Sequence, residues 1–261
     1  MLAGTPDGVF EYSPDHPIWK NTARWDLPAG AARSSSGPVV RDLFQRTPRD
    51  PIYAATSAGL FESADGKIWK RLPFPLSDGG VYAVASFGEQ NQNLLAATSL
   101  RLALSRDHGA TWSPVSLDGS RPIRVHRITP NPTRPEVVFV ATEAGLFRST
   151  DGGLSWAAPG RGLPVASQYD VSISVGNPLQ VFAAGASGAF YSLDGGEWYS
   201  RLGDTVSSDG LTMGMSALQL VSGSEFVAAS LHNGLFFQDG RQDGRQDGRD
   251  ATLPLLPRPQ R

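Results

Sequence analysis

The 261-residue chain contains no cysteine, which excludes disulfides, thiol nucleophiles and cysteine-bound metal. It also contains no apolar run that approaches the roughly 18 residues of a membrane-spanning helix, so we expect no membrane span. Neither sign of charge dominates, because 23 Lys and Arg stand against 25 Asp and Glu, for a formal net charge of −2. A basic surface of the kind that binds nucleic acid is therefore not expected.

Several catalytic and binding motifs are missing as well. No two of the four histidines have a metal-ligand spacing. There is no Gly-x-Ser-x-Gly nucleophile elbow and no glycine-rich phosphate loop. We therefore expect no metal and no cofactor. No segment keeps a 3.6-residue apolar period, so the sequence predicts essentially no helix.

What the chain does contain is one short phrase in five copies, at residues 8–19, 59–69, 101–112, 145–156 and 188–198, with a sixth, incomplete copy at 234–240. The aspartates of the copies are Asp15, Asp65, Asp107, Asp151, Asp194 and Asp239, so the steps are 50, 42, 44, 43 and 45 residues. A period of this length is typical of a propeller of four-stranded blades. We therefore predict an all-β protein.

Each repeat has four short β-branched or aromatic runs between turn residues, which is the pattern of four strands. The predicted blades of this single domain, residues 1–261, are approximately 1–25, 39–74, 80–117, 122–160, 168–202 and 213–257. The second run of each repeat is almost continuously apolar, which indicates burial on both faces. Two segments interrupt the period: 26–38, a polar loop, and 238–250, three tandem QDGR units that we interpret as a loop.

The phrase resembles the Asp-box, or BNR, repeat. Ser149, Asp151, Gly153, Ser155 and Trp156 fit that pattern throughout, and the copies at Asp15, Asp65 and Asp194 are one residue short before the tryptophan. We predict a structural role for the aspartates, as acceptors of backbone N–H groups in a turn, and for the tryptophans, which pack between sheets. These tryptophans are Trp19, Trp69, Trp112, Trp156 and Trp198.

The ends of the chain suggest an incomplete array. The first repeat begins at its second strand, and the last has only a proline-interrupted candidate for its fourth. Two interpretations stay open: a propeller of about six blades with an imperfect seam, or part of a larger one. We expect the natural start, with an export signal, to lie upstream, and hence an extracytoplasmic location.

Candidate functional residues lie on the first strands, because these line the channel of a propeller. For binding they are Arg41, Tyr82, Arg124, His126, Arg127 and Tyr169. Asp42 and Asp170 are the carboxylates inside these strands, and a glycosidase needs two acids about 5–10 Å apart. If the chain were a hydrolase, this would be its catalytic pair. The alternative is that each aspartate pairs with a neighbouring arginine and is structural.

Asp-box proteins include sialidases, xyloglucan-degrading glycosidases, sortilin-type receptors and photosystem II assembly factors. The sialidase Arg-Ile-Pro signature is missing here, and xyloglucan-degrading relatives build their cleft between two propellers. The resemblance is greatest to the assembly-factor branch, which implies a non-catalytic platform that binds a protein or a glycan. The alternative is a glycoside hydrolase, or the remnant of one, that acts on a polysaccharide.

Overall fold

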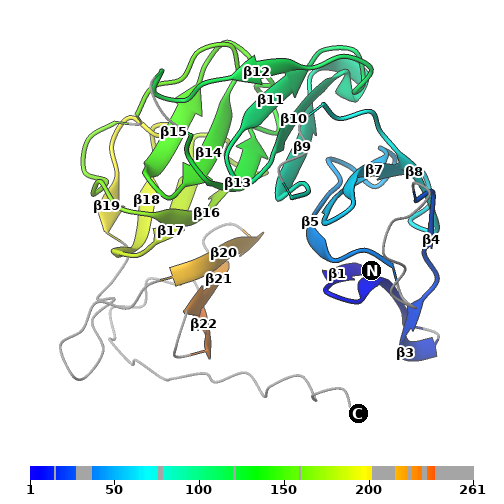
Figure 1. The fold of residues 1–261 in the computed structure, drawn as a ribbon. Helices are drawn as coiled ribbons and strands as arrows, with labels where there is room; N and C mark the ends of the chain where they lie inside the picture. The colour runs from blue at the N-terminus through cyan, green and yellow to red at the C-terminus, as the bar shows by residue number, and fades with distance from the viewer. Residues whose placement is uncertain are drawn as a thin grey trace. The chain divides into compact units, whose positions relative to one another are not determined.

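The structure is a computed structural model, shown in Figure 1, and it describes most of the chain. The described residues are 1–14, 16–27, 37–75, 79–119, 122–158 and 160–201, together with the backbone of three later strands. The chain divides into two compact units, Met1–Val140 with Phe147–Ala157, and Ala141–Leu146 with Ala158–Arg261. We describe each unit by itself. No helix in the described part is long and apolar enough to cross a membrane.

The first unit consists of short, sequentially hydrogen-bonded strands (Figure 1). A three-stranded sheet holds β1 (Leu2–Thr5), β2 (Gly8–Ser13) and β3 (His16–Asn21). A second sheet has the order β4-β8-β7-β6-β5, from β4 (Arg24–Trp25), β5 (Val40–Phe44), β6 (Ile52–Thr56), β7 (Gly59–Ser63) and β8 (Ile68–Arg71). A third holds β9 (Ala83–Phe87), β10 (Asn93–Ala97), β11 (Leu102–Ser105) and β12 (Ser113–Val115).

The next sheet is β13 (Val125–Pro130), β14 (Val138–Thr142) and β15 (Gly145–Ser149). The second unit contains a sheet of β16 (Gln168–Ile173), β17 (Val181–Gly185), β18 (Gly188–Ser192) and β19 (Ser200–Arg201). It also contains β20 (Met215–Ser222), β21 (Glu225–Ser230) and β22 (Gly234–Gln238). The helix content of the described residues is one 3₁₀ turn, η1 (Glu89–Asn91), so the prediction of an all-β chain is confirmed.

The core lies between sheets, as the apolar second strands predicted. β6, β14 and β17 are buried along their whole length. Tyr53 and Leu60 of one sheet pack with Val84 and Leu94 of the next in a single apolar cluster. The third and fourth residues are alanines in β6 and β17 and Val140 and Ala141 in β14, and burial of the larger side chains stabilises the packing.

One strand was not predicted. β4 pairs in parallel with β8, so that Arg24 stands opposite Ile68 and Trp25 opposite Trp69. The indole of Trp25 stacks on that of Trp69, with ring centroids 5.0 Å apart. The linker after the first sheet thus becomes the outer strand of the second. Of the predicted 26–38 loop, residues 28–36 lie outside the described part, as do residues 239–250 of the QDGR loop.

The predicted fourth strand of the fourth repeat is reduced to one bridge between Arg148 and Ala157. The first strands were predicted to start at Val39, Val81, Ile123, Tyr169 and Met213. Four of them start one or two residues later, whereas β16 starts one residue earlier, at Gln168.

Candidate functional site

The Asp-box turns form a repeated hydrogen-bond clip. In the fourth copy the buried Ser149 hydroxyl donates to Asp151 Oδ1 at 2.8 Å and accepts the Gly153 N–H at 2.8 Å. Asp151 then accepts the N–H groups of Leu154 and Ser155. The same serine contacts recur at Ser63, Ser105 and Ser192, with hydroxyl-to-carboxylate distances of 3.1, 2.8 and 2.7 Å. These aspartates close hairpins, whereas Asp15 lies outside the described residues.

The electrostatics of the turns agrees with this structural role. Hydrogen bonds from the Thr111 hydroxyl and N–H lower the pKa of Asp107 to about 2. Burial raises the pKa of Asp151, but hydrogen bonds from Ser155 and Ser149 outweigh it and bring the value to about 2. A carboxylate held ionised in this way is a poor general acid near neutral pH.

In three copies the tryptophan side chain adds a further hydrogen bond to the Asp-box turn. The indole N–H of Trp69, Trp112 and Trp156 donates to the carbonyl of the Asp-box glycine at 3.1, 3.0 and 3.1 Å. Trp69 is fully buried, while Trp19 of the first copy is exposed.

The fifth copy corrects the prediction for Trp198. Its N–H donates to Asp194 Oδ1 at 3.0 Å, which is the bond that Ser155 makes to Asp151 in the fourth copy. Trp198 therefore occupies the serine position and is 55% exposed, while Tyr199, 2% exposed, occupies the tryptophan position. This turn is of full length. Among the Asp-box turns that the structure describes, the one at Asp65 is one residue shorter, since the Ser63 hydroxyl accepts from Gly66, only three positions on.

Residues from three first strands and the loops before them meet in the first unit. We call Arg41, Asp42, Tyr82, Arg124 and Arg127 the first-strand cluster. The Arg41 guanidinium carbon lies 3.9 Å from the centroid of the Tyr82 ring, and that of Arg124 lies 5.5 Å from it. Each guanidinium is attracted to the quadrupole of the ring, and this attraction holds two positive charges close together at Tyr82.

Arg41 is fixed by the loop that precedes β9. Its Nη1 donates to the carbonyl of Gly79 at 3.0 Å and to that of Val81 at 3.3 Å. Gly80 between them has φ +95°, and a Cβ there would lie 2.6 Å from the Thr56 carbonyl and 2.8 Å from Arg41 Nη1. Only glycine lets the loop pass this closely.

Asp42 has both carboxylate oxygens engaged. Oδ1 accepts from Arg127 Nη1 at 2.7 Å, and Oδ2 accepts the Val84 N–H at 3.1 Å. The side chain of Asp42 is 8% exposed and that of Arg127 is 38% exposed. Burial raises the pKa of Asp42, against the lowering influence of Arg127 and the N–H groups of Val84 and Leu43. The carboxylate thus ties β5 to β9 and β13.

Two predicted site residues sit at strand irregularities. The pairing of β5 with β6 shifts between Val40 and Asp42, at Arg41, and that of β16 with β17 shifts between Gln168 and Asp170, at Tyr169. Bulges of this kind re-aim a side chain and are common beside functional sites.

The remaining predicted residues are placed as follows. His126 is half-buried on β13. Tyr169 and Asp170 are half-buried on β16 in the second unit, where Asp170 Oδ1 accepts the Val171 N–H at 2.9 Å. In the described residues no three His, Asp or Glu side chains are grouped as a metal would require.

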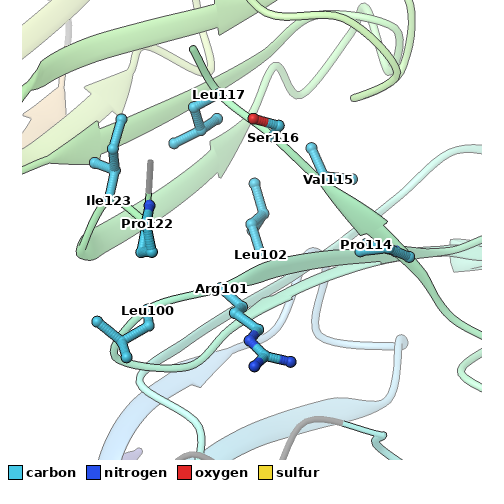
Figure 2. A pocket seen from close by; sticks show the side chains of 9 residues that line it. All are labelled: Leu100, Arg101, Leu102, Pro114, Val115, Ser116, Leu117, Pro122 and Ile123. Carbon is cyan, nitrogen blue, oxygen red and sulfur yellow. The ribbon is translucent and has the colours of Figure 1, made fainter. Parts of the chain in front are cut away.

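A pocket of about 200 Å³ was not anticipated from the sequence. It lies where the β10–β11 turn faces β12 and the chain leading to β13. Figure 2 shows Leu102 pointing toward Leu117 in its middle, with Ile123 to one side. Leucine, isoleucine, valine and proline form the wall, together with Arg101 and Ser116; the Arg101 guanidinium points away from Leu102 (Figure 2). The two prolines of residues 114–123, with Val115, Leu117 and Ile123, were the sequence signal for it.

Comparison with known proteins extends these observations. No family model matches the chain. A curated xyloglucanase from Hypocrea jecorina is 26% identical over 172 residues, which are 64% of the chain and 20% of that protein. The chain therefore spans about a fifth of this relative's length.

Solved structures match over more of the chain. One match is an extracellular domain of a putative hybrid two-component system from B. thetaiotaomicron, with a TM-score of 0.65 at 13% identity. The match covers 92% of the present chain and 32% of the B. thetaiotaomicron chain. Another match is the GH74 enzyme of Niastella koreensis, with a TM-score of 0.57 at 22% identity. This match covers 74% of the present chain and 33% of the Niastella koreensis chain. The chain has the fold of a β-propeller. At these identities the likeness establishes the propeller fold, and the activities in these names stay with those proteins.

Proposed function

We propose that this propeller is a non-catalytic binding platform that presents the first-strand cluster to an anionic ligand. The observation that carries the proposal is the state of Asp42, whose two oxygens are already engaged by Arg127 and Val84. Although burial raises the pKa of Asp42, its side chain is only 8% exposed and both oxygens are already engaged, so it has little surface with which to reach a leaving group.

The charge of the cluster supports an anionic ligand. Three arginines stand against one aspartate, and the aspartate is neutralised by Arg127. Arg41 is held through Nη1 by the carbonyls of Gly79 and Val81, and its guanidinium has further donors at Nε and Nη2 that can face two oxygens of an anion. Arginine binds carboxylates through such paired donors.

The alternative function is glycoside hydrolysis through Asp42 and Asp170, and the likeness to a xyloglucanase favours it. The two are separated by a screen of polysaccharides and aryl glycosides with the wild type, Asp42→Asn and Asp170→Asn. The platform predicts no turnover above background in any of the three. Turnover that either asparagine variant abolishes would overturn the platform and establish the hydrolase.

An extracytoplasmic location fits the platform, and the extracellular domains among the structural matches are the observation in its favour. The ligand would then be a protein or glycan outside the cytoplasm. Expression of the full reading frame followed by cell fractionation tests the location, and recovery with cytoplasmic markers would contradict it.

A further inference from the structure

The pocket and the first-strand cluster are neighbours on the same stretch of chain. Ile123, 5% exposed, lines the pocket, and Arg124, exposed, belongs to the cluster. Consecutive Cα atoms are about 3.8 Å apart, so one short ligand segment can reach both. Both features lie within the first unit.

From this adjacency we propose that the pocket seats one apolar side chain of an extended acidic peptide, whose carboxylates contact Arg41 and Arg124. This proposal rests on the proposed function and names the ligand class. The volume of about 200 Å³ suits a single leucine-sized or phenylalanine-sized side chain. Apolar burial supplies affinity, and the arginines supply selectivity for acidic flanks.

The charge around the pocket fits an acidic partner. No lining residue is acidic, and Arg101 is the basic one. Asp118 follows the lining residue Leu117 in sequence, is exposed and does not line the pocket. Among the described residues, Arg41 and Arg124 of the cluster are the basic residues that such a partner would meet next.

A glycan fits the same surface less well. Sugar recognition relies on an aromatic face together with many hydrogen-bonding groups, and the pocket wall has aliphatic side chains and proline, with Ser116 as its neutral polar residue. The nearest aromatic ring of the cluster, Tyr82, already carries Arg41 at 3.9 Å. The observations therefore favour a peptide, and an acidic glycan becomes an outcome of the test.

The test uses the whole chain and an array of eight-residue peptides. Each peptide has one Leu, Ile, Met or Phe, or Ser in its place, flanked by zero to four Asp or Glu. Binding is measured by fluorescence anisotropy, with polygalacturonate as competitor. We expect binding that requires both the apolar residue and the acids, and that weakens at high salt because the charges are near the surface.

Leu100→Glu places a charge at the pocket, and Leu154→Glu is its matched control. Leu100 is 52% exposed and Leu154, in the Asp-box turn outside the pocket, is 60% exposed, so neither change removes a buried side chain. We expect Leu100→Glu to weaken peptide binding at least ~10-fold, the effect of losing most of one apolar side chain's burial. Leu154→Glu should bind as the wild type does.

The outcomes separate the two proposals. Acidic peptides that bind equally well with Ser in place of the apolar residue, or equally well to Leu100→Glu, would overturn the pocket while leaving the platform intact. Polygalacturonate binding without any peptide binding would do the same. No binding to peptide or glycan would remove support from both.

Discussion

Replacing Arg127 with methionine should destabilise the first unit in a pH-dependent way, because it leaves Asp42 buried without its cation. Breaking a buried ion pair from one side costs about 3–5 kcal/mol. Here Arg127 is 38% exposed, so water compensates part of its loss, and Asp42 keeps the Val84 N–H. We therefore expect Arg127→Met to lower the free energy of unfolding by about 2–3 kcal/mol near neutral pH.

The sign of the pH dependence follows from the pKa of Asp42. Burial already raises that pKa above its unfolded value, and removal of Arg127 raises it further. A group with a raised pKa stabilises the folded state most below the unfolded value of about 3.8, and that stabilisation is lost as pH rises through the folded value. The difference between variant and wild type should therefore be larger at about pH 7.5 than at about pH 4.5.

Urea denaturation followed by tryptophan fluorescence measures this, since Trp25, Trp69, Trp112 and Trp156 all belong to the first unit. Arg134→Met is the matched control, because Arg134 pairs with Glu136 at 3.3 Å with both side chains about half exposed, and such a pair contributes about 0–1 kcal/mol. An Arg127→Met loss no greater than that of Arg134→Met, or one that does not change with pH, would refute the reasoning.

Three further predictions concern the Asp-box turns. Ser149→Ala should cost about 1–2 kcal/mol in urea denaturation, because it leaves the buried Gly153 N–H without its acceptor; no measurable loss would contradict the clip. Asp107→Asn should reduce the loss of stability between about pH 4 and pH 2. The folded state lowers the pKa of Asp107, so the ionised carboxylate stabilises the fold above its unfolded pKa, and this stabilisation is lost as pH falls through its folded pKa. An unchanged dependence of stability on pH would argue against this role. In thermal unfolding, Tyr199→Ala should lower the free energy of unfolding by about 3–5 kcal/mol, because Tyr199 is buried, whereas Trp198→Ser should change it by no more than about 0.5 kcal/mol. A larger loss for Trp198→Ser than for Tyr199→Ala would show that Trp198 is the packing residue.

Sequence patterns predicted the parts of this molecule that are local. The contacts of an Asp-box clip fall within eight consecutive residues, so spacing alone is enough to propose Ser149 and Asp151 as partners. The fifth copy shows where spacing fails. Two glycines, Gly195 and Gly196, precede Trp198, and only the backbone bonds to Asp194 decide which residue takes which position.

Long-range partners could not be predicted in the same way. The pair between Asp42 and Arg127 spans 85 residues. The sequence offered arginines on several first strands as partners for Asp42, and the choice depends on how neighbouring sheets pack. The pocket is set by the same packing, since its wall combines a hairpin turn, an outer strand and a connecting loop.

The linkers explain how the loops before the first strands are held. Arg24 donates its N–H to the Lys67 carbonyl at 2.6 Å, and Arg161 donates to the Glu197 carbonyl at 2.9 Å. Each arginine stands five positions after the tryptophan of an Asp-box copy and forms a parallel bridge to the next box, at Ile68 and Trp198 respectively. Both linkers thus enter the following sheet in one register. Arg41, Tyr82 and Arg124 lie at or just before first strands, at β5, β9 and β13. The described repeats therefore share their clips, and two of them share a linker register, whereas the first-strand residues differ where we propose that the ligand binds.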